Sequence, residues 1–197
     1  TPLAITSDGA PGLIRAVDEV FPQCLRIRCW AHKMRNVLDK VPDEARSEVK
    51  AFLQAVRDAP TLEAGRQAVQ EVLERYGSRY PSAMRSFSDD LEASLAHLQV
   101  PVRHRKCVRT TNLIERSFVE QRRRTKVIPY FMTEKSCLKL VFATLWRASE
   151  RWQRLRISEL ERKQLEALAR SLGLDPTPGG GGRRQQEQLD EITSHVA

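Results

Sequence analysis

Hydrophobic positions near the start of the chain follow first a strand pattern and then a helical one, and this order is repeated once. Residues 3–6 are a short apolar run that leads into a polar turn containing glycine and proline, which predicts the end of a strand. Apolar residues recur every three or four positions over 12–21, which is typical of a helix. Residues 24–30 alternate apolar and basic side chains and predict a second strand, and a further helix is expected over 31–38.

The middle of the chain has only helical patterns. Between residues 43 and 98 we predict three helical segments, separated by 59–61 and by 77–81. Two strands cannot form a stable sheet alone. The pattern therefore predicts a mostly helical chain with two or three short strands. Either residues outside this chain complete the sheet, or the protein is essentially helical.

Two further helices and a linker are predicted at the end of the chain. A long amphipathic helix is expected over 134–155, with Leu138, Val141, Phe142, Leu145 and Trp152 on its apolar side. A last helix over 159–172 has Ser158 as its predicted cap and Gly173 as its end. The proline- and glycine-rich residues 176–184 are expected to form a flexible linker before a polar tail.

Composition is that of a globular chain with 41% apolar residues. No run of 18 apolar residues exists, so we expect no membrane-spanning helix, and the early polar turn predicts no signal peptide. The four cysteines are sparse and are expected to be reduced cytosolic thiols. Because the chain opens with Thr1 rather than Met, we expect a fragment or a processed product.

The net charge of +8 is concentrated in one segment. Residues 103–126 hold nine Lys or Arg against two Glu, a net charge of +7, whereas residues 43–98 hold ten acidic residues against seven basic ones. Such a local excess of positive charge is typical of a phosphate-binding surface. The alternative is a solvated charge run without function, although an idle helix usually mixes both signs.

Two carboxylates are candidates for chemistry. Asp8 follows the first predicted strand, where carboxylates of α/β folds face the ligand crevice, but an Asp-Gly pair there is also an ordinary turn. Glu115 lies within the basic segment and could hold a divalent metal ion against a phosphate. The alternative for Glu115 is a capping box, with Asn112 as N-cap and Glu115 as the third helical residue.

Cysteine and histidine form two pairs with the spacing of zinc ligands, Cys29 with His32 and His104 with Cys107. About 70 residues separate the pairs, far more than a compact zinc finger uses. We therefore expect no structural zinc. Cys29 is expected to pack in the core, and His32 to form hydrogen bonds near the site or to contact DNA.

Taken together, these motifs resemble the Mutator family of bacterial insertion-sequence transposases. The resemblance covers about residues 1–155 and is carried by Ser7-Asp8-Gly9, by Cys29-Trp30-Ala31-His32, by Arg109-Thr110-Thr111-Asn112-Leu113-Ile114-Glu115-Arg116 and by Arg122-Arg123-Arg124-Thr125-Lys126. The third string, followed by the basic run, is its most specific part. Cys29 and His32 match the family's paired positions.

The resemblance implies an α/β fold, with a ribonuclease-H-like core interrupted by an all-helical insertion, and an Asp-Asp-Glu site that binds Mg²⁺ or Mn²⁺. Asp8 matches the family's second Asp and Glu115 its Glu, while the first Asp is expected on an earlier strand, upstream of Thr1. The implied domains are core (1–42), helical insertion (43–100), core with the Glu helix and basic segment (101–157), and terminal helix, linker and tail (158–197). No organic cofactor is expected.

The implied function is transposition of an insertion element by metal-dependent DNA cleavage and strand transfer at its ends, in the bacterial cytoplasm at the nucleoid. The implied partners are DNA and, in the active family member, further copies of the protein, with no membrane. The expected DNA-binding residues are Arg109, Asn112, Arg116, Arg122, Arg123, Arg124 and Lys126. Because the first Asp is expected to lie elsewhere, we expect this chain alone to be inactive. Two alternatives are a catalytically dead DNA-binding remnant and a helical protein-interaction module.

Overall fold

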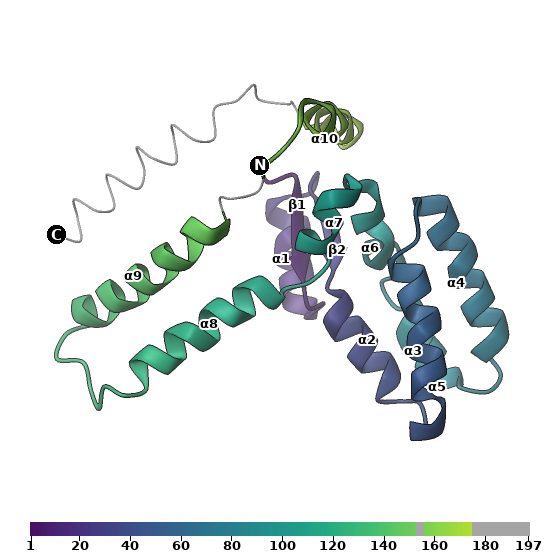
Figure 1. The fold of residues 1–197 in the computed structure, drawn as a ribbon, viewed down its shortest axis with the longest axis horizontal. Coiled ribbons are helices and arrows are strands. Elements are labelled where there is room, and N and C mark those ends of the chain that lie inside the picture. The colour runs from purple at the N-terminus through teal and green to yellow at the C-terminus, as the bar shows by residue number, and fades with distance from the viewer. Residues whose placement is uncertain (153–155, 175–197) are drawn as a thin grey trace. The chain divides into compact units, whose positions relative to one another are not determined.

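A computed structural model describes residues 1–152 and 156–174 of the chain (Figure 1). It is mostly helical with two short parallel strands, as the sequence predicts. Packing divides the chain into two compact units. Of the described residues, the first contains Thr1–Asn112 and Glu159–Leu174, and the second contains 113–152 and 156–158. This division follows packing, and the functional domains listed above remain a prediction.

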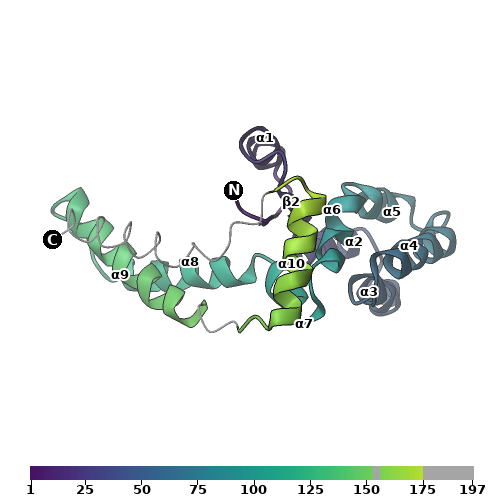
Figure 2. The same ribbon diagram turned by 90° about the horizontal axis from the view of Figure 1, so that it is seen from above.

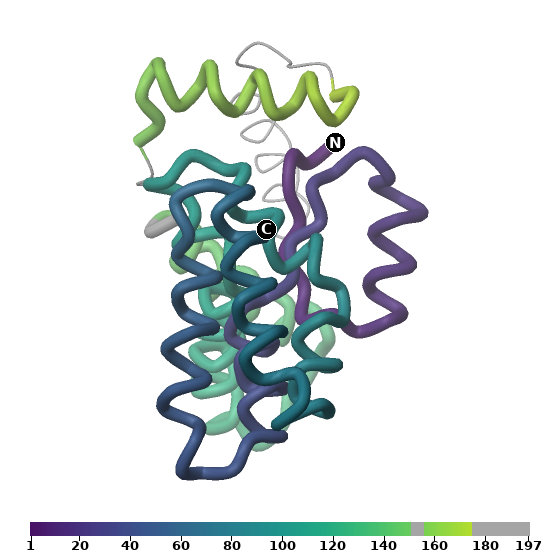
Figure 3. Tube along the Cα trace, turned by 90° about the vertical axis from the view of Figure 1, so that its right-hand side faces the viewer, coloured from purple at the N-terminus to yellow at the C-terminus, as the bar shows by residue number. Residues whose placement is uncertain are grey.

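The first unit begins with a strand–helix–strand element. Strand β1 (Ala4–Ser7) pairs in parallel with β2 (Leu25–Arg28), and helix α1 (Pro11–Val20) connects them. The register joins Ala4 to Leu25 and Ser7 to Arg28, so both strands end at the same level. The predicted strands and helix are confirmed within one or two residues. In Figure 3, α1 lies on one side of the strand pair and the helical block on the other.

Four helices form the larger hydrophobic core of this unit. They are α2 (Trp30–Leu38), α3 (Asp43–Arg57), α4 (Leu62–Tyr76) and α5 (Pro81–Ser88). Their buried side chains share one cluster with Trp30, Val49, Leu53, Val72 and Phe87 among its members. Thr61 caps α4 by accepting a hydrogen bond from the backbone N–H of Ala64 at 3.1 Å. The predicted breaks at residues 59–61 and 77–81 are both confirmed.

The third predicted helical segment is interrupted at Asp89 and Asp90. After α5 the chain continues as α6 (Leu91–Leu95), a 3₁₀ turn (Ala96–Gln99) and α7 (Val102–Val108). Asp90 has a left-handed backbone, with φ +53°, and both oxygens of its carboxylate accept hydrogen bonds from Arg26 at 2.6 Å. A contact with β2 therefore fixes a backbone conformation that ends the helix.

Helix α10 (Glu159–Ser171) returns to the first unit and lies across the end of the strand pair at which β1 begins (Figure 1 and Figure 2). Leu168 of α10 shares a buried cluster with Leu25, Ile27, Ala96 and Val100. Gly173 ends the helix with φ +72°, as expected. The alternation of apolar and basic residues in β2 is explained by this packing, because Leu25 and Ile27 enter the cluster while Arg26 binds Asp90.

Truncation of Leu168 should measure how strongly α10 is bound. Leu168 is 8% exposed, so Leu168→Ala should lower the free energy of unfolding by about 2–3 kcal/mol. Leu160 lies on the same helix but is 68% exposed, and Leu160→Ala should change stability by less than about 0.5 kcal/mol. Urea denaturation compares the two variants. Equal effects would show that α10 is not held through this cluster.

The second unit is built from α8 (Asn112–Thr125) and α9 (Glu134–Trp152). Phe142 and Trp146 of α9 have their ring centroids 5.8 Å apart. Leu138 is 55% exposed, so the predicted apolar side of α9 is not fully covered within the unit. The predicted helix residues 153–155, the side chain of Trp152, and the predicted linker and tail lie outside the described residues. None of the helices described is long and apolar enough to cross a membrane.

Candidate catalytic and nucleic-acid-binding site

Asp8 lies directly after β1, at the carboxyl end of the strand pair, and its side chain is exposed. One carboxylate oxygen, Oδ1, accepts a hydrogen bond from the backbone N–H of Ala10 at 3.1 Å. Gly9 follows with φ +86°. Asp8 therefore stabilises the turn, as expected for an ordinary Asp-Gly pair. It also presents a carboxylate at the ends of the strands, as expected for a catalytic residue.

Arg28 places a positive charge beside this turn. It ends β2 in register with Ser7, and only 6% of its surface is exposed. Its guanidinium occupies the space that a Cβ atom on Gly9 would fill, and its Nε has no hydrogen-bond partner. The sequence interpretation missed this residue. Aligning the two predicted strands in parallel would have placed it opposite Ser7, next to Asp8.

Cys29 is fully buried and its sulfur is surrounded by hydrogen-bond donors. Sγ accepts from the backbone N–H and from the hydroxyl of Thr111, both at 3.3 Å, and lies 3.3 Å from Nδ1 of His32. Burial raises the pKa of the Cys29 thiol, but the hydrogen bonds from Thr111 and His32 outweigh burial, so the pKa is lowered overall. Cys29 packs in the interior, as expected, and it also binds Thr111, which was not expected.

The second Cys/His pair is engaged elsewhere. His104 is buried on α7 with its Nε2 3.4 Å from a carboxylate oxygen of Glu161, while Cys107 is exposed. Within residues 1–152 and 156–174, no three His, Cys, Asp or Glu side chains lie close enough together to hold a metal ion. The structure brings Cys29 and His32 together but does not join them to the pair on α7.

The segment 108–111 is attached to the strand pair at two further points. The hydroxyl of Thr6, on β1, donates to the carbonyl of Val108 at 2.5 Å. The backbone N–H of Trp30 donates to the carbonyl of Arg109 at 2.9 Å. The residues immediately before α8 are therefore held by the strand that leads to Asp8 and by the start of α2.

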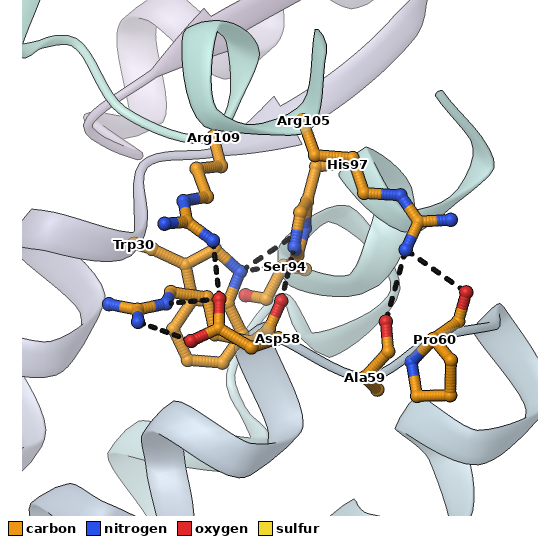
Figure 4. A network of polar contacts seen from close by, with 9 residues as sticks. Trp30, Asp58, Ala59, Pro60, Ser94, His97, Arg105 and Arg109 are labelled. Atoms are coloured by element: carbon orange, nitrogen blue, oxygen red, sulfur yellow. Dashed lines mark hydrogen bonds and ion pairs between the residues drawn. The ribbon is translucent and has the colours of Figure 1, made fainter. Parts of the chain in front are cut away.

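Two residues of the basic segment bind within the first unit (Figure 4). Arg109, a predicted DNA contact, forms an ion pair with Asp58, which also binds Arg57 at 2.5 Å. Hydrogen bonds from Arg57, with a smaller contribution from Arg109, lower the pKa of Asp58. The guanidinium of Arg105 donates to four backbone carbonyls, those of Ala59, Pro60, Leu98 and Val100. These two arginines tie the segment to the helical block.

Trp30 and His97 form the buried part of the same network. Nε1 of Trp30 donates to the carbonyl of Ser94 at 2.7 Å and lies 3.3 Å from Nδ1 of His97. Nε2 of His97 lies 2.8 Å from the carbonyl of Arg57. Nδ1 of His97 also lies 2.9 Å from the carbonyl of Ser94, so each ring nitrogen faces a backbone acceptor. Burial lowers the pKa of His97, which favours a neutral ring. His97 is thus a structural residue.

Glu115 lies in the first turn of α8 and is exposed. The helix begins at Asn112, one residue earlier than the predicted capping box requires. Glu115 and Arg122 lie on one side of α8 because seven positions separate them, and Lys126 lies in the turn directly after the helix. Arg116, Arg122, Arg123 and Lys126 are exposed, and Arg124 pairs with Glu120 at 2.8 Å. The helix thus presents one carboxylate and several cations to solvent.

Comparison with known proteins gives a consistent result. The family model described as "Transposase, Mutator family" matches residues 3–155. A transposase of insertion element IST2 from Acidithiobacillus ferrooxidans is 35% identical over 151 residues, which are 77% of this chain and 51% of that protein. A transposase of IS6120 from Mycolicibacterium smegmatis is 34% identical over 77% of this chain and 47% of its own length. A transposase of ISRM5 from Rhizobium meliloti is 32% identical over 75% of this chain and 37% of its own length. The chain spans about half the length of these relatives, or less.

Proposed function

The chain belongs to the Mutator family of transposases, and on this basis we propose that it forms part of an enzyme that moves an insertion element. The proposed reaction is metal-dependent cleavage and strand transfer of DNA at the element ends. The observation that carries the proposal is the exposed carboxylate of Asp8 at the carboxyl end of two parallel strands, beside the Arg28 guanidinium. Ligand sites of α/β folds lie at this end of the strands.

The finer proposal is a ribonuclease-H-like core with an Asp-Asp-Glu site. Its support is the parallel strand–helix–strand element, in which Asp8 follows the first strand and which is followed by a helical block before Glu115. Asp8 and Glu115 supply carboxylate oxygens, which are the donors that Mg²⁺ prefers. Bound metal ions would activate the attacking hydroxyl and neutralise the charge that develops on the phosphate. One oxygen of Asp8 already accepts the Ala10 N–H, which fixes the orientation of the carboxylate.

We also propose that α8 binds DNA, and that several copies of the protein act together on two element ends. Arg122 on α8 and Lys126 in the turn directly after it would place cations along the phosphates that follow the reacting one. Replacing both Arg122 and Lys126 by glutamine should weaken DNA binding. It should also reduce the slope of log affinity against log salt concentration by up to about 1.8, because each phosphate contact contributes about 0.9.

A matched control for this prediction is the pair Arg35→Gln and Lys50→Gln. Arg35 on α2 and Lys50 on α3 are both exposed, and replacing them removes the same charge as replacing Arg122 and Lys126. Fluorescence anisotropy with a labelled duplex over a range of NaCl concentrations measures both slopes. Equal reductions in the two variants would show that the total charge attracts DNA and that α8 is not the binding surface.

A catalytically dead DNA-binding remnant is the second candidate function, favoured by the basic segment. The two functions differ in their dependence on metal ions. Mn²⁺ binding that is lost in Asp8→Ala supports the enzyme. Salt-sensitive DNA binding that is unchanged in Asp8→Ala, without Mn²⁺ binding in either protein, supports the remnant.

A further inference from the structure

We propose that Cys29 is a positioning residue whose sulfur holds Thr111 and so fixes where the helix that carries Glu115 begins. The inference rests on the proposed function, because it gives the Cys-x-x-His motif a task in the same reaction. It assigns neither a metal nor covalent chemistry to the cysteine. Thr111 immediately precedes α8 and lies four residues before Glu115 in the sequence.

Two of the three polar contacts of the sulfur come from one residue, Thr111. Both the backbone N–H and the hydroxyl of Thr111 donate to Sγ of Cys29 at 3.3 Å, over a separation of 82 residues in sequence. His32, one turn further along α2, adds a third contact at 3.3 Å. Two donors from one residue fix both its backbone and its side chain, which a packing contact alone would not do.

The other cysteines do not share this environment. Cys24 is half-buried, and burial raises the pKa of its thiol, with a further increase from Asp18. Cys107 is exposed, and Cys137 lies on α9 in the second unit. Cys29 combines complete burial with three polar contacts, from Thr111 and His32. The geometry therefore distinguishes it from a cysteine that acts only as a small apolar residue.

The contact between Cys29 and Thr111 is one of several contacts between the strand pair and the residues just before α8. Thr6 binds the carbonyl of Val108, and Thr6 lies two residues before Asp8 on β1. The backbone N–H of Trp30 binds the carbonyl of Arg109. Cys29 supplies the link nearest to α8, at Thr111. A change in this link should therefore disturb the carboxylate on α8 more than the folding of the strand pair.

The test uses Cys29→Ala, Thr111→Val and the double variant, in the protein expressed from its complete reading frame. Cys29→Ala removes the acceptor, and Thr111→Val removes the hydroxyl donor while keeping the shape of the side chain. Single-turnover cleavage of element-end DNA should slow by about 10- to 100-fold in Cys29→Ala, as is usual for residues that support metal ligands. The double variant should be no slower than the slower single variant, since both remove one shared contact.

Three readouts separate positioning from general damage to the fold. The Mg²⁺ concentration for half-maximal cleavage should rise about tenfold in Cys29→Ala, whereas partial unfolding would reduce the amplitude and leave that midpoint unchanged. DNA affinity should stay within about twofold, because no phosphate contact is lost. Cys29→Ser, which keeps an acceptor, should recover part of the rate, and Cys24→Ala in the same unit should behave like the wild type.

The outcomes also distinguish this inference from the proposed function. If the wild-type protein cleaves DNA and the Cys29→Ala variant is equally active, the inference is overturned and the proposed function remains intact. A wild-type protein that does not cleave DNA would overturn the proposed function and the positioning role with it. In that case, amide hydrogen exchange at Thr111 still reports the contact itself. Exchange should accelerate in Cys29→Ala, and an unchanged rate would show that the sulfur does not hold this residue.

Discussion

Asp8→Asn is expected to abolish metal-dependent cleavage while leaving the fold unchanged. Asparagine keeps an oxygen that can accept the Ala10 N–H, so the turn after β1 persists. It removes the anionic oxygen that a divalent cation needs. Metal ions supply several kcal/mol of transition-state stabilisation, and each 1.4 kcal/mol is a factor of ten in rate, so the loss should be about 1,000-fold. Single-turnover cleavage of labelled element-end DNA in Mg²⁺ measures it.

The control for this variant is Asp18→Asn on α1. Asp18 is 62% exposed and lies 3.7 Å from Arg26, so its replacement removes the same charge from a weak surface contact. Its cleavage rate should stay within about twofold of the wild-type rate. Glu115→Gln should resemble Asp8→Asn. An Asp8→Asn protein that cleaves at the wild-type rate would exclude Asp8 from the metal site.

Lys33 is expected to make the stability of the first unit rise with pH between about 8 and 10.5. The side chain is 1% exposed, and burial lowers its pKa from 10.5 to about 8. Arg28 and Lys40 lower this pKa further, while Asp89 and Asp90 oppose the shift. Below pH 8 both folded and unfolded states carry the proton. Above pH 8 the folded state loses it first, so the unfolded state binds more protons and stability increases with pH.

The size of this effect follows from the shift in pKa. Each unit corresponds to about 1.4 kcal/mol, so the gain over the whole window should be about 3 kcal/mol. Urea denaturation at pH 7.5 and at pH 10 gives the free energies of unfolding, and the comparison is with Lys33→Met, which lacks the titrating group. Lys50→Met, at an exposed position on α3, should show the same pH dependence as the wild type. A wild-type curve parallel to that of Lys33→Met would show that Lys33 titrates normally.

Local sequence patterns predicted the strands and most helices because these depend on nearby residues. Turn residues mark the ends of β1 and α10, and proline precedes or begins several helices. The break at Asp89 and Asp90 was not predictable in this way. Its cause is Arg26, 64 residues away, which binds the Asp90 carboxylate through two hydrogen bonds. Nothing within the segment indicates that partner.

The residues of the candidate site also differ in whether the sequence could predict them. Asp8 and Glu115 are recognisable from their motifs, and the structure places each at an exposed end of its element. Arg28 and Thr111 were missed because their roles depend on strand register and on contacts between distant segments. Arg109 was predicted to bind DNA from its place in the basic segment and in the family motif, and in the structure it pairs with Asp58. Charge shows that a segment is basic, but it does not show which of its cations are already bound.

The most direct test of the central proposal is to map the products formed from DNA that carries the ends of the element. The protein from its complete reading frame is incubated with this DNA in Mg²⁺ or in EDTA, and the cut is located to the nucleotide. We predict a break at the junction of the terminal repeat, with a free 3′-hydroxyl, in Mg²⁺ only. Salt-sensitive binding of the same DNA without any cleavage in Mg²⁺ or Mn²⁺ would contradict the account and identify a DNA-binding remnant.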